Sequence, residues 1–220
     1  MKRINLSFTL QIISIFMIGV VLQFSSCAPK TPDDCGFQQN VYGQRISWKN
    51  KLPVDLVISS SIPVELKSAI YRAANSWERT LGKKAFNLVE ENLQNSALPG
   101  RDKKNGIYFL KNWESDKKTE QGRTSVYWAG DEIQEADIRI NAYNFSYYNE
   151  NAQQLIRAEN VKDNSAGYSF EALVLHEMGH FLGLKHKEES GSVMATYLSA
   201  NTDRVQPAAV DSLDTRCEYQ

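Results

Sequence analysis

Short runs of alternating apolar and polar residues predict five β-strands in the middle of the chain. They span residues 53–59, 86–89, 106–110, 125–128 and 136–141. In the last run Ile138 and Ile140 share one face, while Asp137 and Arg139 share the other. This alternation is typical of a sheet that is buried on one face.

Apolar residues at spacings of three and four predict a long helix between the first two strands. Its apolar face consists of Leu66, Ile70, Ala73, Ala74 and Trp77. We expect Ser61 to cap its N-terminus, with Pro63 near the first turn, and the helix to end near Leu81-Gly82.

Two further helices are predicted in the C-terminal third. The apolar side chains that follow Ser169, up to Leu184, indicate a buried helix, and residues 205–219 have mostly helical spacings. With the five strands, these helices predict an α+β fold. The aromatic residues Tyr143, Phe145, Tyr147 and Tyr148 either line a cleft or pack under a loop, and packing is the simpler interpretation.

The N-terminal pattern predicts export. Lys2 and Arg3 precede an apolar run over residues 4–24, and small residues lead to Cys27. This arrangement resembles the lipobox of bacterial lipoproteins, in which cleavage leaves a lipidated cysteine at the N-terminus. We therefore expect a membrane-anchored lipoprotein in the periplasm or on the cell surface; an ordinary secretory signal and an uncleaved anchor are the alternatives.

The chain divides into three predicted parts. Residues 1–26 form the signal peptide, and residues 27–45, which contain Pro29, Pro32, Gly36 and Gly43 without an apolar period, form a tether. Residues 46–220 then form one catalytic domain, because a chain of 220 residues is short for two domains that each have a sizeable core.

Composition narrows the function little. A hydrophobic content of 42% and a net charge of −1 are ordinary for a globular protein. They provide no basic field, so we expect no nucleic-acid partner.

The three histidines of the chain all lie in one motif, HEMGHFLGLKH, at residues 176–186. On a helix His176 and His180 project from the same face, one turn apart, and can bind one metal ion. Gly183 allows a turn that brings His186 to the same point. Three protein ligands leave a fourth position free for water, as in catalytic zinc sites, and Glu177 would polarise that water.

The pattern HExxHxxGxxH followed by a methionine turn resembles the metzincin zinc endopeptidases. The step of eight residues from His186 to Met194 is similar to the matrixin branch. The resemblance implies a twisted mixed sheet of about five strands with a long N-terminal helix, an active-site helix, a Met-turn and a C-terminal helix. It also implies one catalytic Zn²⁺ on the three histidines, Glu177 as general base, Met194 as an apolar floor, and an extended peptide paired with the strand at residues 125–128.

Some positions depart from the family pattern. No histidine remains for the second, structural zinc that matrixins generally bind, and Lys187 replaces a common serine. Thr196 occupies the place where some metzincins have a metal-binding tyrosine, so Tyr197 is kept only as a weak candidate for contact with the reacting peptide. A gluzincin, with a glutamate as third ligand, is disfavoured because Glu188 and Glu189 follow His180 too closely.

Cys35 and Cys217 lie near opposite ends of the mature chain. In an oxidising compartment they can form a disulfide, which we favour. Two unrelated thiols, or Cys35 as a latency ligand over the zinc, are the alternatives.

The sequence thus predicts a zinc-dependent endopeptidase, most simply a monomer, that acts on proteins or peptides and is held at a membrane through Cys27. The alternative is a non-catalytic surface lipoprotein that binds a partner and keeps zinc as a scaffold.

Overall fold

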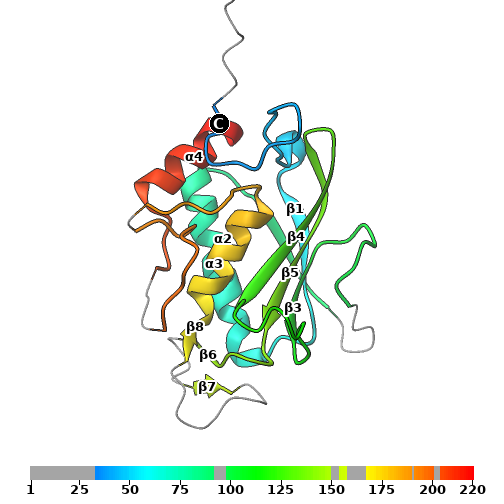
Figure 1. The fold of residues 1–220 in the computed structure, drawn as a ribbon, viewed down its shortest axis with the longest axis vertical. Helices are drawn as coiled ribbons and strands as arrows, with labels where there is room; N and C mark the ends of the chain where they lie inside the picture. The colour runs from blue at the N-terminus through cyan, green and yellow to red at the C-terminus, as the bar shows by residue number, and fades with distance from the viewer. Residues whose placement is uncertain (1–32, 92–97, 150–153, 158–166, 190, 201–203) are drawn as a thin grey trace, which may run out of the picture. The chain divides into compact units, whose positions relative to one another are not determined.

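A mixed sheet of five strands is the framework of the computed structural model, which describes residues 33–91, 98–149, 154–157, 167–189, 191–200 and 204–220 (Figure 1). The strands are β1 (Val54–Ile58), β2 (Phe86–Glu90), β3 (Gly106–Leu110), β4 (Gly122–Ala129) and β5 (Glu132–Asn141). Their order is β2-β1-β3-β5-β4, and only β4 runs antiparallel to its neighbour. The predicted α+β fold with five strands is confirmed, and β4 lies at an edge of the sheet.

Two helices, α2 (Val64–Leu81) and α3 (Phe170–Phe181), lie side by side against one face of this sheet (Figure 1). The fully buried indole of Trp77 joins them, because its N–H donates to the carbonyl of Leu175 at 2.8 Å. A third helix, α4 (Ala209–Tyr219), packs on α2, and a short 3₁₀ turn, η1, spans Lys49–Lys51. Within the described residues, none of the helices has the length and apolarity that crossing a bilayer requires.

A second, smaller sheet was not predicted. It contains β6 (Tyr147–Asn149), β7 (Gln154–Ile156) and β8 (Tyr168–Ser169) in the order β7-β6-β8. Tyr147 is fully buried and packs edge to face on Phe109 and Phe170. The interpretation of this aromatic residue as packing is therefore confirmed.

The N-terminus of α2 differs from the prediction. Pro63 is the residue that precedes the helix, and the hydroxyl of Ser61 accepts a hydrogen bond from the Phe109 amide at 3.0 Å. The proposed cap at Ser61 is wrong because β3 occupies that hydroxyl. The predicted end is confirmed, since Gly82 adopts the left-handed conformation with φ 68°.

The polar face of β5 is also more buried than its pattern indicates. Asp137 is 1% exposed and accepts hydrogen bonds from the amides of Gly100 and Gly106 at 2.9 and 3.0 Å. Burial raises the pKa of this carboxyl to about 6, although the two amides act in the opposite direction. The loop before β3 therefore covers a face that alternation alone assigns to solvent.

Residues 33–48, which we call the N-terminal strap, pack on the domain. Phe37 is fully buried and forms a bridge with Leu184. On either side, the Gln38 amide donates to the Gly183 carbonyl at 2.9 Å and the Lys185 amide donates to the Gly36 carbonyl at 2.8 Å. The tether predicted for residues 27–45 is therefore wrong for residues 33–45, and the folded unit begins at Asp33. The predicted signal peptide and Cys27 lie outside the described residues.

A disulfide joins Cys35 of the strap to Cys217 of α4 across 182 residues of sequence. Beside it, the carboxylate of Glu218 accepts hydrogen bonds from Arg45 at 2.5 Å, Ser47 at 2.6 Å and Lys49 at 2.9 Å. Burial raises the pKa of Glu218, but the three hydrogen bonds outweigh it and hold the pKa below its ordinary value. The strap and α4 are thus joined by a covalent bond and an ionic cluster.

We expect Glu218→Gln to lower the free energy of unfolding at pH 7, because it removes the charge that the strap binds. A depressed folded-state pKa gives stability that is present above the unfolded pKa of about 4.5 and is lost as the pH falls through the folded pKa. The difference between wild type and variant should therefore shrink below pH 4.5. Denaturant unfolding of both proteins at several pH values above and below 4.5 measures this difference. Asp116→Asn, at an exposed carboxylate, is the control. A difference that did not change with pH would contradict the stabilising role of the Glu218 charge.

Candidate metal centre and active site

Helix α3 carries the first two histidines and Glu177. Its N-terminus is capped by the hydroxyl of Ser169, which accepts a hydrogen bond from the Ala172 amide at 3.3 Å. The helix is apolar nearly all round and is buried between α2 and the sheet. The predicted spacing places the rings of His176 and His180 on one face, with their Nε2 atoms 3.1 Å apart.

The chain turns back at Gly183 and brings the third histidine to the same point. Gly183 has φ 105°, and a Cβ there would lie 2.3 Å from the carbonyl oxygen of Ile46. After this turn the Nε2 of His186 lies 3.1 Å from that of His180. The ligand atoms of all three histidines lie within 4.8 Å of one another.

Backbone carbonyls fix the orientation of two of the rings. The Nδ1 atom of His176 lies 2.7 Å from the Val193 oxygen, and that of His180 lies 2.8 Å from the Leu184 oxygen. A carbonyl only accepts, so each Nδ1 carries the proton and each Nε2 presents a bare lone pair. Two bare nitrogens 3.1 Å apart cannot hydrogen-bond to each other, whereas a shared cation satisfies both. The donor set therefore fits zinc, which imidazole nitrogens bind readily.

The three imidazoles are held in the neutral form that metal binding needs. Burial, with a smaller contribution from neighbouring imidazoles, lowers the pKa of His176 to about 3 and that of His180 to about 4. Burial also lowers the pKa of His186. At neutral pH the histidines therefore do not need to lose a proton to accept a cation.

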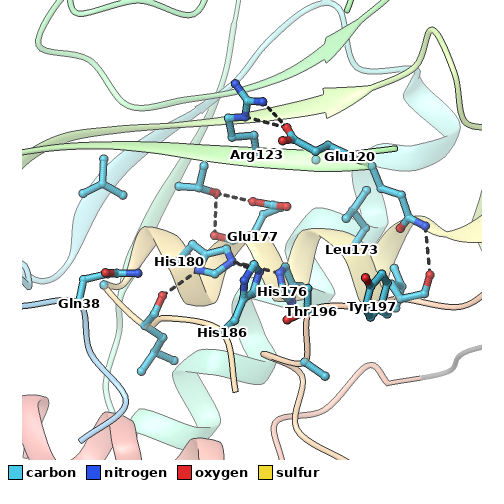
Figure 2. A pocket seen from close by; sticks show the side chains of 18 of the residues that line it. Gln38, Glu120, Arg123, Leu173, His176, Glu177, His180, His186, Thr196 and Tyr197 are labelled. Carbon is cyan, nitrogen blue, oxygen red and sulfur yellow. Dashed lines mark hydrogen bonds and ion pairs between the residues drawn. The ribbon is translucent and has the colours of Figure 1, made fainter. Parts of the chain in front are cut away.

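Glu177 lies next to the histidines, beneath β4 (Figure 2). It is 3% exposed, and the Thr124 hydroxyl donates to its Oε2 at 2.7 Å. Burial raises the pKa of this carboxyl to about 7, partly offset by that hydrogen bond. Glu177 was predicted from the motif, whereas Thr124 carries no signal in the sequence, because a threonine in a strand is ordinary and the contact joins distant segments.

Met194 packs against α3 at Gly179. It is 2% exposed, and a Cβ on Gly179 would lie 2.2 Å from its sulfur, so Met194 packs directly on the helix between the two helical histidines. The fully buried carboxylate of Asp211 fixes this turn by accepting from the Ser192 hydroxyl at 2.5 Å and the Val193 amide at 3.0 Å. Asp211 was missed, since an acidic residue in the first turn of a helix is common.

A cleft of about 700 Å³ contains the three histidines and Glu177. One wall is β4, which contributes Gly122, Arg123, Thr124, Val126 and Trp128, and the other is the segment of residues 195–198. The strand predicted to border the cleft therefore does so, and from Thr124 onward it does so through alternate residues. Tyr197 belongs to the lining and is 83% exposed, so the structure places this weak candidate at the rim (Figure 2).

Cys35, which the sequence offered as a possible ligand over the metal, is paired in a disulfide. Because Cys35 is bonded to Cys217, its sulfur is not available as a latency ligand to a metal.

Comparison with known proteins agrees with this geometry. No curated protein matches the chain. The matrixin family model matches residues 59–217, a range that covers well over half of the chain and contains the three histidines, Glu177 and Met194. On this match the chain belongs to the matrixin family, a branch of the metzincin zinc metalloproteases.

Proposed function

We propose that this protein is a zinc-dependent endopeptidase that hydrolyses peptide bonds with Glu177 as its general base. The observation that carries the proposal is the convergence of three neutral imidazole nitrogens within 4.8 Å, in the same cleft as a buried carboxylate. A scaffold site for zinc has no use for such a carboxylate, so this arrangement favours catalysis over the binding alternative.

His176, His180 and His186 would hold the ion. Zinc bound there supplies Lewis-acid polarisation of the peptide carbonyl and of an attacking water. The carbonyls of Val193 and Leu184 support this role by keeping the Nε2 atoms of His176 and His180 free and aimed at one point.

Glu177 would carry the proton through the reaction. Its carboxylate takes a proton from water as the water oxygen bonds to the carbonyl carbon. It then gives that proton to the amide nitrogen as the C–N bond breaks, which leaves a carboxylic acid and an amine. Burial raises the pKa of this carboxyl above its ordinary value, which strengthens it as a proton acceptor.

The edge position of β4 favours an extended peptide as substrate. An edge strand offers its outer amides and carbonyls to a further strand, and the cleft runs along β4. Because such pairing needs an extended main chain, unfolded proteins and flexible segments should be cleaved before compact ones. We also propose that the protein is exported and anchored to a membrane by a lipid on Cys27.

The proposal is tested by incubating the purified protein with denatured casein. We expect cleavage that a zinc chelator abolishes and that added zinc restores. Glu177→Gln should keep its zinc, and its kcat should fall about 100-fold or more, because the glutamine amide is too weak a base to take a proton from water. Product analysis by mass spectrometry and zinc analysis of the same samples provide the measurements.

Glu188→Gln is the matched control, because Glu188 lies near His186 but is exposed and outside the cleft lining. It should cleave like the wild type. Undiminished cleavage by Glu177→Gln would refute the role of Glu177, and wild-type protein that cleaves nothing would favour the binding alternative.

His186→Ala should weaken zinc binding independently of turnover. Even residues that only orient metal ligands contribute about 10- to 100-fold to affinity, so loss of a ligand should cost more than about 100-fold. Competition with a chromophoric chelator measures this directly. Wild-type affinity in the variant would rule out His186 as a ligand.

Cys27→Ser should abolish lipid attachment. Wild-type protein produced in bacteria should incorporate labelled fatty acid and fractionate with membranes, because stable anchoring requires covalently attached acyl chains. The variant should do neither. Persistent labelling of Cys27→Ser would show that the lipid is elsewhere.

A further inference from the structure

We infer that β4 is a positioning element for the general base, in which Gly122 and Thr124 form a cradle that fixes the carboxylate of Glu177. The inference rests on the proposed function of Glu177 and names two residues that act through it. We call these two residues the β4 cradle.

Thr124 supplies the directional contact. Its Oγ1 lies 2.7 Å from Oε2 of Glu177 and 3.1 Å from the Glu177 backbone oxygen. An ionised carboxylate only accepts, so the hydroxyl must donate its single proton, and the shorter distance favours the carboxylate. The terminal torsion of a glutamate is otherwise broad and roughly two-fold, so this hydrogen bond selects one orientation of the two oxygens.

Gly122 supplies the space for the other oxygen. A Cβ at this position would lie 2.7 Å from Oε1 and 3.1 Å from the carboxyl carbon of Glu177. Glycine weakens a strand interior and often marks a close approach by another group. Here the approaching group is the catalytic carboxylate, which rests against the backbone of β4.

The sheet makes the cradle rigid. Gly122 and Thr124 are alternate residues on one face of β4, paired with Ile140 and Ile138 of β5, both fully buried. Glu177 comes from α3, so the contact between its carboxylate and β4 depends on how the helix packs against the sheet. Without β4, nothing in the cradle would hold the carboxylate in one orientation.

The cradle contacts Glu177 through a neutral group. The nearby guanidinium of Arg123 is bound to Glu120, with Nε 2.8 Å from Oε2, on the opposite side of β4 from Glu177 (Figure 2). The positive charges of Arg123 and Arg139 act on Glu177 only through space, where they favour its ionised form, while the hydroxyl of Thr124 supplies the directional contact.

The decisive variants are Thr124→Val and Thr124→Ser, which separate the hydroxyl from the shape of the side chain. Valine keeps the branched form that suits a strand but cannot donate. We expect Thr124→Val to lower kcat about tenfold with KM unchanged, and Thr124→Ser to stay near wild type. The substrate is a fluorescence-quenched peptide whose sequence spans a bond that the protein cleaves in casein.

Gly122→Ala tests the second half of the cradle. The clash falls on the flexible end of a side chain, so the variant should fold normally while the carboxylate moves, again lowering kcat rather than raising KM. Ser125→Ala is the matched control, because Ser125 lies on β4 outside the cleft lining, and it should keep wild-type kinetics.

Crystal structures of zinc-loaded wild type and Thr124→Val provide a readout that needs no turnover. We expect one carboxylate position in the wild type and a displaced or divided one in the variant. Wild-type kcat in Thr124→Val, equal damage in Thr124→Ser, or an unmoved carboxylate would overturn the inference. If the wild type cleaves nothing, the proposed function fails, while the crystal comparison still decides whether the cradle holds Glu177.

Discussion

The site works only if the lone pairs of His176, His180 and His186 point at one position. Desolvation keeps the rings neutral, and the carbonyls of Val193 and Leu184 accept from the Nδ1 atoms so that Nε2 stays free. Each carbonyl must itself be held. Val193 lies in the turn that Asp211 fixes to α4, and Leu184 is paired with Phe37 of the N-terminal strap. Elements from both ends of the domain therefore converge on the orientation of two rings.

Much of this arrangement was predictable because it is encoded locally. Residues four apart on a helix share a face in any fold, so His176 and His180 could be paired from spacing alone. Gly183 could be assigned a turn because few residues tolerate such a backbone. The five strands and the long helix followed from periodicities that core packing imposes on each segment separately.

The parts that escaped prediction depend on contacts between distant segments. Asp211 serves residues 192 and 193, and Thr124 serves Glu177, yet neither carries a pattern in its own neighbourhood. The strap gives no periodic signal, because its buried side chains, such as Cys35 and Phe37, are few and unevenly spaced among polar residues and two glycines. Ser61 could cap a helix or bind a strand, and only the position of β3 decides. The residue type determines which hydrogen bonds each of these side chains can form, while the tertiary fold determines which residue it bonds to.

The disulfide decides where a force applied to the N-terminal side of the strap would enter the domain. Tension applied ahead of Asp33 reaches Cys35 within two residues and passes through the sulfur–sulfur bond into α4. That helix is secured by Tyr219, whose hydroxyl donates to the Leu182 carbonyl at 2.6 Å. The hydrogen bonds from the Lys185 amide to Gly36 and from the Gln38 amide to Gly183 come later along the strap than the cross-link. The covalent bond therefore shares such a force with these hydrogen bonds and with the ion pair between Asp34 and Lys185, so that α4 resists it together with the segment that presents His186.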